Sequence, residues 1–153
     1  MDSKGTVASK TNVVEMKGSG YNYFDGDRIV EVVSKNGVSD SFLTHLRKVG
    51  IPYIFAGEDS VDSGVAFHKM CECLGEKQGF VFGGATLNGS FLKQGLVTDV
   101  SLLQVPAFSN NDKDLPLFNP TEGKFPPLFL NLVASESVGR GGTWLHYALD
   151  KKE

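Results

Sequence analysis

A pair of adjacent glycines, Gly83 and Gly84, is the stretch of this sequence whose residue types best suit a chemical role. The apolar residues 80–82 before the pair predict a buried strand, and the residues after it predict a short helix that ends at Gly95. A strand that feeds a helix through glycines exposes backbone N–H groups at the positive end of the helix dipole, where a phosphate can bind. Neither glycine carries a Cβ that would keep a ligand from the backbone. The pattern therefore indicates a phosphate site, although the same pair also occurs in ordinary strand-to-helix turns.

The cysteines and histidines indicate no metal site and no nucleophile. Cys71 and Cys73 lie two apart in an expected helix. This spacing points them to different sides, which favours packing over a disulfide or a metal site. His45, His68 and His146 fall on separate expected elements with no cysteine or carboxylate at ligand spacing, so we expect surface or partly packed histidines. This cysteine usage fits a reducing compartment without requiring one.

The composition is that of an ordinary globular domain: 153 residues, 41% hydrophobic and 22% charged. A net charge of -3 gives no basic surface, so we expect no nucleic-acid partner. No apolar run approaches the roughly 18 residues that a membrane span needs. The first residues lack the hydrophobic core of a signal peptide, and we therefore expect a cytoplasmic protein.

The elements that must position the glycine pair alternate between strand and helix. Expected strands occupy residues 27–34, 51–57, 80–82 and 97–105, and expected helices occupy residues 40–49, 64–74 and the segment that ends at Gly95. Ser39 is a good N-cap for the first helix, which Gly50 ends, and Asp62 or Ser63 caps the second.

This alternation predicts an α/β fold with mainly parallel strands and crossover helices. Residues 128–134 and 143–148, joined by a glycine-rich connection, predict a C-terminal antiparallel hairpin. The sheet should therefore be mixed. Residues 1–27 are rich in Lys, Ser, Gly and Asn and predict an irregular arm or remnant before a domain at residues 28–150.

Several motifs occur in one order along this domain and resemble the reductase domain of bacterial riboflavin biosynthesis. That domain is the C-terminal, dihydrofolate-reductase-like part of a bifunctional deaminase-reductase. The motifs lie at residues 30–35, 38–47, 50–59, 83–92, 95–96, 101–106 and 141–147. The resemblance covers roughly residues 28–149. It implies a dihydrofolate-reductase-like mixed sheet, a homodimer, and NADPH-dependent reduction of the ribosyl group of a phosphoribosylamino-pyrimidine, 5-amino-6-(5-phosphoribosylamino)uracil.

The resemblance also implies roles for two segments. Ser34 and Lys35 match the strand end that holds the 2′-phosphate and adenosine ribose of NADPH, and a hydroxyl beside a cation suits a phosphate monoester. Most such Ser-Lys pairs are solvated turns, which is the alternative here. The second segment matches the turn that receives the pyrophosphate and approaches the nicotinamide. Its residues are Gly83, Gly84, Ala85, Thr86 and Leu87.

The sequence departs from this family at three motif positions and at its front. Phe82 stands where the family usually has an acidic residue, Ala85 where it has a third glycine, and Thr98-Asp99 where it has an Asp-Glu pair. Nothing in residues 1–27 looks like the first strand and loop of the family domain, so we expect an N-terminally truncated member. Two other functions stay open: a non-catalytic domain for assembly or binding, and a dihydrofolate-reductase-like oxidoreductase with another substrate. The sequence identifies no catalytic acid.

Overall fold

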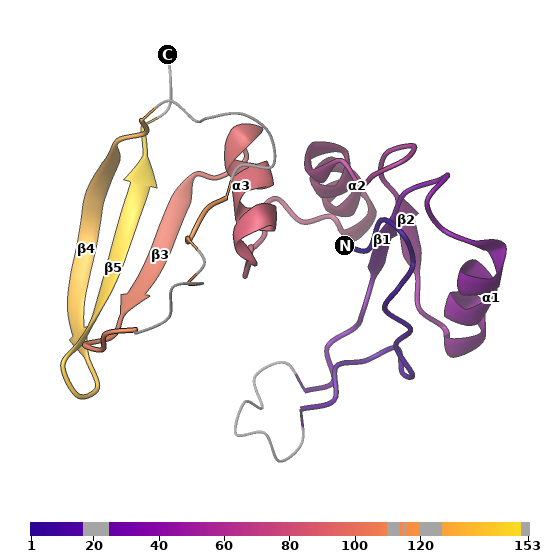
Figure 1. Cartoon of the computed structure of the whole chain (residues 1–153), viewed down its shortest axis with the longest axis horizontal. Coiled ribbons are helices and arrows are strands. Elements are labelled where there is room, and N and C mark those ends of the chain that lie inside the picture. Colours follow the sequence, from indigo (N-terminus) through magenta and orange to yellow (C-terminus); the bar gives the residue numbers. More distant parts are fainter. Residues whose placement is uncertain (17–24, 110–113, 115, 120–126, 151–153) are drawn as a thin grey trace. The chain divides into compact units, whose positions relative to one another are not determined.

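The chain divides into two compact units, Met1–Gly79 and Phe80–Glu153, and each is described by itself. The structure is a computed structural model that describes residues 1–16, 25–109, 114, 116–119 and 127–150 (Figure 1). The rest of the predicted arm and most of the segment between residues 109 and 127 lie outside the described residues. No helix among the described residues is long and apolar enough to cross a membrane.

The first unit is built on two short parallel strands, β1 (Glu31–Val33) and β2 (Tyr53–Phe55), with Val32 opposite Ile54. Helix α1 (Asp40–Val49) connects them, and α2 (Ser63–Leu74) follows β2. Neighbouring residues of a strand point to opposite faces. Accordingly, Val33 packs in a cluster with α1 residues, whereas Val32 packs with Ala66 of α2. This arrangement confirms the predicted strand-helix-strand-helix order.

Local sequence signals define both helices of this unit. The hydroxyl of Ser39 accepts a hydrogen bond from the Phe42 N–H at 3.2 Å, and the carboxylate of Asp62 accepts one from the Val65 N–H at 2.9 Å. Gly50 follows α1 in the left-handed region, with φ of 79°, where a residue with a Cβ is strained. Because the cap residues and the stop signal are local, these predictions are confirmed residue by residue.

Within the first unit, the described part of the N-terminal segment packs against β1 and the loop after β2. The Asp2 N–H donates to the Val32 carbonyl oxygen at 2.9 Å, and the Val61 N–H donates to the Ser3 hydroxyl at 3.0 Å. Further along, Val13 forms an isolated antiparallel bridge with Arg28. These contacts provide the docking that an arm of such polar composition needs in order to be ordered.

The described part of the second unit is an antiparallel sheet with one helix. Helix α3 (Ala85–Lys93) precedes β3 (Asp99–Gln104), and β4 (Leu130–Val138) and β5 (Gly142–Leu149) form the predicted hairpin. The strand order is β3-β5-β4, with both pairings antiparallel. The described residues thus form a mixed α/β structure with three helices, as expected.

Two features of the predicted sheet are wrong. The mainly parallel character is wrong because, among the described strands, only β1 and β2 pair in parallel. Strand β3 runs antiparallel to β5, a long-range pairing that the alternation of elements could not reveal. The strand at residues 80–82 is also wrong: this segment forms no strand, and Phe80 and Phe82 are each 81% exposed. Three apolar residues are too short a run to distinguish a strand from an exposed connection.

Candidate functional site

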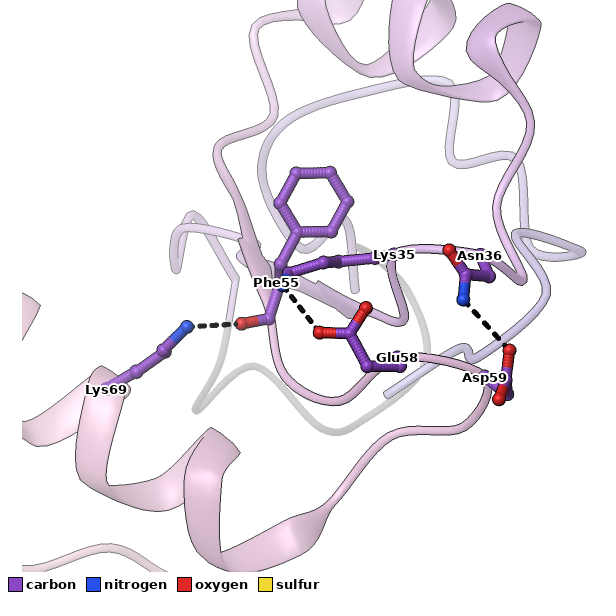
Figure 2. A network of polar contacts seen from close by, with 6 residues as sticks. All are labelled: Lys35, Asn36, Phe55, Glu58, Asp59 and Lys69. Atoms are coloured by element: carbon purple, nitrogen blue, oxygen red, sulfur yellow. Dashed lines mark hydrogen bonds and ion pairs between the residues drawn. The ribbon is translucent and has the colours of Figure 1, made fainter.

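The first candidate segment lies at the carboxyl ends of β1 and β2. Past the two strands, the Lys35 N–H donates to the Gly57 carbonyl oxygen at 3.1 Å and the Asn36 N–H to that of Glu58 at 2.7 Å. These bonds continue the parallel pairing into the loops and hold Lys35 opposite Glu58 (Figure 2). Carboxyl ends of parallel strands are where open α/β sheets bind their ligands.

Charged and polar side chains pair across this strand end. The Lys35 ammonium lies 2.5 Å from a carboxylate oxygen of Glu58, and both side chains are more than half exposed. The Asn36 amide donates to the Asp59 carboxylate at 3.0 Å, while Lys69 donates to the Phe55 carbonyl oxygen at 2.8 Å. Figure 2 shows these pairs around the end of β2. An incoming anion would therefore meet a cation that a carboxylate already engages.

Ser34 occupies a different environment from its neighbour. It is fully buried, and its hydroxyl donates to the Ser3 carbonyl oxygen at 2.7 Å and lies 3.3 Å from that of Asp59. A Cβ at Gly37 would collide with the same Ser3 oxygen and with the Ser34 hydroxyl. The Ser34 hydroxyl thus ties the N-terminal segment to the strand end.

The second candidate segment is the glycine turn before α3. Gly83 has φ of 87°, and Gly84 is the N-cap of α3 with no side-chain hydrogen bond to the helix. The first intrahelical bond runs from the Asn88 N–H to the Gly84 carbonyl oxygen at 3.0 Å. The N–H groups of the three preceding helical residues therefore lie at the positive end of the dipole. Those residues are Ala85, Thr86 and Leu87.

The surroundings of the two glycines differ. A Cβ at Gly84 would meet no atom of the chain within 4 Å, as far as the described residues extend. The backbone of Gly84 has φ of -70°, which any residue can adopt. A Cβ at Gly83 would be strained by its positive φ and would lie 3.6 Å from the Asn88 amide nitrogen. The open side of Gly84 is where a ligand can reach the backbone.

Asn88 is a residue of this turn that the sequence reasoning missed. Its amide nitrogen donates to the Leu117 carbonyl oxygen at 2.9 Å, and the Asn119 N–H donates to the Ala85 carbonyl oxygen at 2.9 Å. The two bonds hold residues 117–119 against the first turn of α3. The amide oxygen of Asn88 is buried and accepts no hydrogen bond from the described residues. An amide in the first turn after a glycine pair was the only available signal.

A further polar cluster lies on the three-stranded sheet. An imidazole nitrogen of His146 lies 2.9 Å from the Asp99 carboxylate. The His146 ring stacks on Trp144, with the two ring centroids 6.1 Å apart. The Trp144 indole donates to the Ser101 hydroxyl at 2.8 Å. Hydrogen bonds from Thr98 and then from His146 hold the pKa of Asp99 below its ordinary value. Among the described residues no three His, Cys, Asp or Glu side chains could hold a metal ion together.

Comparison with known proteins identifies the architecture. No protein-family model and no curated protein matches the sequence. A solved pyrimidine reductase-like protein from Corynebacterium diphtheriae NCTC superposes with a TM-score of 0.69 at 20% identity, over 80% of this chain and 50% of that one. The chain has a riboflavin-reductase-like fold.

A second structure with this riboflavin-reductase-like fold comes from Shewanella sp. PV-4 and is assigned to riboflavin biosynthesis. It has a TM-score of 0.55 at 17% identity, over 87% of this chain and 67% of that one. The present chain spans about half the length of the Corynebacterium protein. Likeness at this level of identity shows the fold, and the activity has to be argued from the residues.

Proposed function

We propose that the chain is the dinucleotide-binding part of an NADPH-dependent reductase that acts on a phosphoribosylamino-pyrimidine. The observation that carries this proposal is the glycine turn before α3. Its helix start has no side-chain cap, and the space beside Gly84 is open within the described structure. Backbone N–H groups at such a helix start bind phosphate groups. The riboflavin-reductase-like fold supports a nucleotide cofactor of this kind.

In the second unit, the proposal assigns the pyrophosphate to Gly83, Gly84, Ala85, Thr86 and Leu87. The residues fit the group, because three consecutive N–H groups point from an uncapped helix start and Gly84 has no Cβ. NADPH, when bound, supplies the hydride for reduction of the opened ribose. The protein's own contribution is to hold the phosphates, keep α3 in place and orient the ring end of the cofactor.

In the first unit, the proposal assigns the 2′-phosphate and adenosine ribose to the strand end at Ser34 and Lys35. Lys35 offers an exposed ammonium, which attracts a phosphate monoester. Ser34 contributes through its position, because its buried hydroxyl fixes the loop that carries Lys35. No residue is assigned the role of catalytic acid.

The substrate is proposed as 5-amino-6-(5-phosphoribosylamino)uracil, the compound that the motif resemblance implies. Of the two comparison proteins, one is described as pyrimidine reductase-like and the other is assigned to riboflavin biosynthesis. The proposed compartment is the cytoplasm, in line with the free thiols of Cys71 and Cys73.

We test the cofactor assignment by calorimetric titration of the purified chain with NADPH, with NADH as comparison. The expected result is binding of NADPH that a Gly84→Val variant loses and a Lys35→Ala variant weakens. Gly84→Val is a clean probe because the added side chain meets open space and a permitted φ. The reductase proposal is wrong if a folded sample shows neither heat nor a thermal shift with millimolar NADPH.

We also propose that the chain forms a homodimer through the edge strand β4. This strand lies at one end of the three-stranded order, and its Leu132 and Val133 are 56% and 57% exposed. Among the described strands β4 has no partner on its outer side, and such an edge readily pairs with another strand. Light scattering after gel filtration should give a dimer mass for the wild type and a monomer mass for Leu132→Lys. A wild-type monomer at high protein concentration would exclude the dimer.

A further inference from the structure

We infer that Glu58 sets the choice between NADPH and NADH by competing with the 2′-phosphate for Lys35. This inference rests on the proposed function, since it concerns the same cofactor. Lys35 follows β1 and Glu58 follows β2, and their charged groups lie 2.5 Å apart. Backbone hydrogen bonds from Lys35 and Asn36 hold the two loops together, so the pairing is a consequence of the strand register.

The two side chains suit opposite cofactors. A carboxylate near the end of the second strand of a dinucleotide fold accepts hydrogen bonds from the ribose hydroxyls of NADH. A cation at the same edge attracts the 2′-phosphate of NADPH, which carries about two negative charges. In this chain the carboxylate and the cation engage each other. A 2′-phosphate must therefore displace Glu58 from Lys35 and then lie close to a carboxylate.

The groups around the pair leave Lys35 as the cation for this role. The Lys69 ammonium is engaged by the backbone, because it donates to the Phe55 carbonyl oxygen at 2.8 Å. Asp59 accepts a hydrogen bond from the Asn36 amide at 3.0 Å, and no cation among the described residues pairs with it. Both charged members of the pair are accessible to a ligand, at 54% exposure for Lys35 and 63% for Glu58.

Asp59 supplies a matched control. Glu58→Gln and Asp59→Asn each remove one negative charge from the same loop, but only the first frees Lys35 from its carboxylate partner. A general change in surface charge would make the two variants behave alike. A specific competition for Lys35 would separate them.

The experiment is calorimetric titration of the wild type, Glu58→Gln, Asp59→Asn and Lys35→Met with NADPH and with NADH. We expect Glu58→Gln to strengthen NADPH binding roughly 5- to 20-fold and to leave NADH unchanged or weaker. Asp59→Asn should change NADPH affinity by less than about twofold. Lys35→Met should weaken NADPH binding and leave NADH binding unchanged, which reverses the preference for NADPH over NADH. Thermal melts of each variant control for folding.

The outcomes separate this inference from the proposed function. Wild-type protein that binds neither dinucleotide overturns both. Wild-type protein that binds NADPH, with a ratio of NADPH to NADH affinity that Glu58→Gln leaves unchanged, overturns the inference alone. An equal gain in NADPH affinity in Glu58→Gln and Asp59→Asn also overturns it, because the gain would then come from the general loss of one negative charge. A gain in NADPH affinity in Glu58→Gln that is larger at low salt than at high salt supports the inference.

Discussion

The first and second units begin their helices in opposite ways. In the first unit, Ser39 and Asp62 cap α1 and α2 with their own side chains. In the second unit, α3 begins at Gly84 with no side-chain cap hydrogen bond. A side-chain cap satisfies one of the free N–H groups of a helix start, whereas a glycine N-cap has no side chain to satisfy any of them. The contrast separates helix starts that side chains cap from one that has no side-chain cap, which is the proposed phosphate site.

The two units also differ in how deeply they bury their apolar side chains. Leu46 of α1 is fully buried in the first unit, whereas the apolar residues of β4 in the second unit are largely exposed. Leu46→Ala should therefore lower the free energy of unfolding by about 2–5 kcal/mol. Leu103→Ala on β3, which lies outside the proposed dimer edge and is 59% exposed, should cost less than about 0.5 kcal/mol. Urea denaturation followed by circular dichroism measures both, and equal costs would contradict the assignment of the main core to the first unit.

The glycine pair gives the next largest effect, now on binding. Gly84→Val should reduce NADPH affinity by at least about tenfold with little change in melting temperature, because its Cβ faces open space within the described structure. Gly83→Val should lower the melting temperature as well, since the φ of Gly83 is 87°. Differential scanning calorimetry with and without NADPH distinguishes the two. If Gly84→Val unfolds the protein, the space beside this glycine is not open.

Changing the N-cap residues tests the contrast between the capped helices of the first unit and the uncapped α3 of the second. Asp62→Ala should destabilise the first unit by about 1 kcal/mol, because the Val65 N–H loses its acceptor. Gly84→Asp should cap α3, add a few tenths of a kcal/mol of stability and repel the phosphates of NADPH. Thermal melts and NADPH titrations should show lower stability in Asp62→Ala, and slightly higher stability with weaker NADPH binding in Gly84→Asp. Tighter NADPH binding by Gly84→Asp would argue against an anion at this helix start.

The smallest effect concerns pH and the Asp99–His146 pair. Hydrogen bonds from Thr98 and His146 lower the pKa of Asp99, so the ionised carboxylate is favoured in the folded state. The pair contributes stability above the ordinary pKa of 3.8, and this stability is lost as the pH falls through the lower folded value. Replacing the imidazole in His146→Leu should move the Asp99 pKa upward, as an NMR titration of the carboxyl carbons would show. An unchanged value would mean that Thr98 alone lowers it.

The sequence predicted well what neighbouring residues decide. The caps Ser39 and Asp62, the stop at Gly50 and the hairpin are confirmed, because each depends on side chains a few residues apart. The direction of β3 was missed, since pairing Val100 with Tyr147 depends on residues distant in sequence. The strand predicted at residues 80–82 is wrong, because aromatic residues favour strands only when a partner covers them, and Phe80 and Phe82 are exposed.

The candidate residues divide similarly. The uncapped glycine turn could be predicted from Gly83 and Gly84, and a helix does start there. The burial of the Ser34 hydroxyl could not, because it depends on Ser3, a residue from the N-terminal segment. The pairing of Lys35 with Glu58 requires the register of β1 against β2, which motifs do not give. Their roles as cofactor ligands stay predictions until the titrations are done.

The most direct test of the glycine turn is an NMR titration of the backbone amides with NADPH. Binding of the pyrophosphate at α3 predicts large chemical-shift changes at Gly84, Ala85, Thr86 and Leu87, with a smaller change at Lys35, and none of these with Gly84→Val. Well-dispersed spectra with no change at these amides up to millimolar NADPH would contradict the proposal that this helix start holds a dinucleotide.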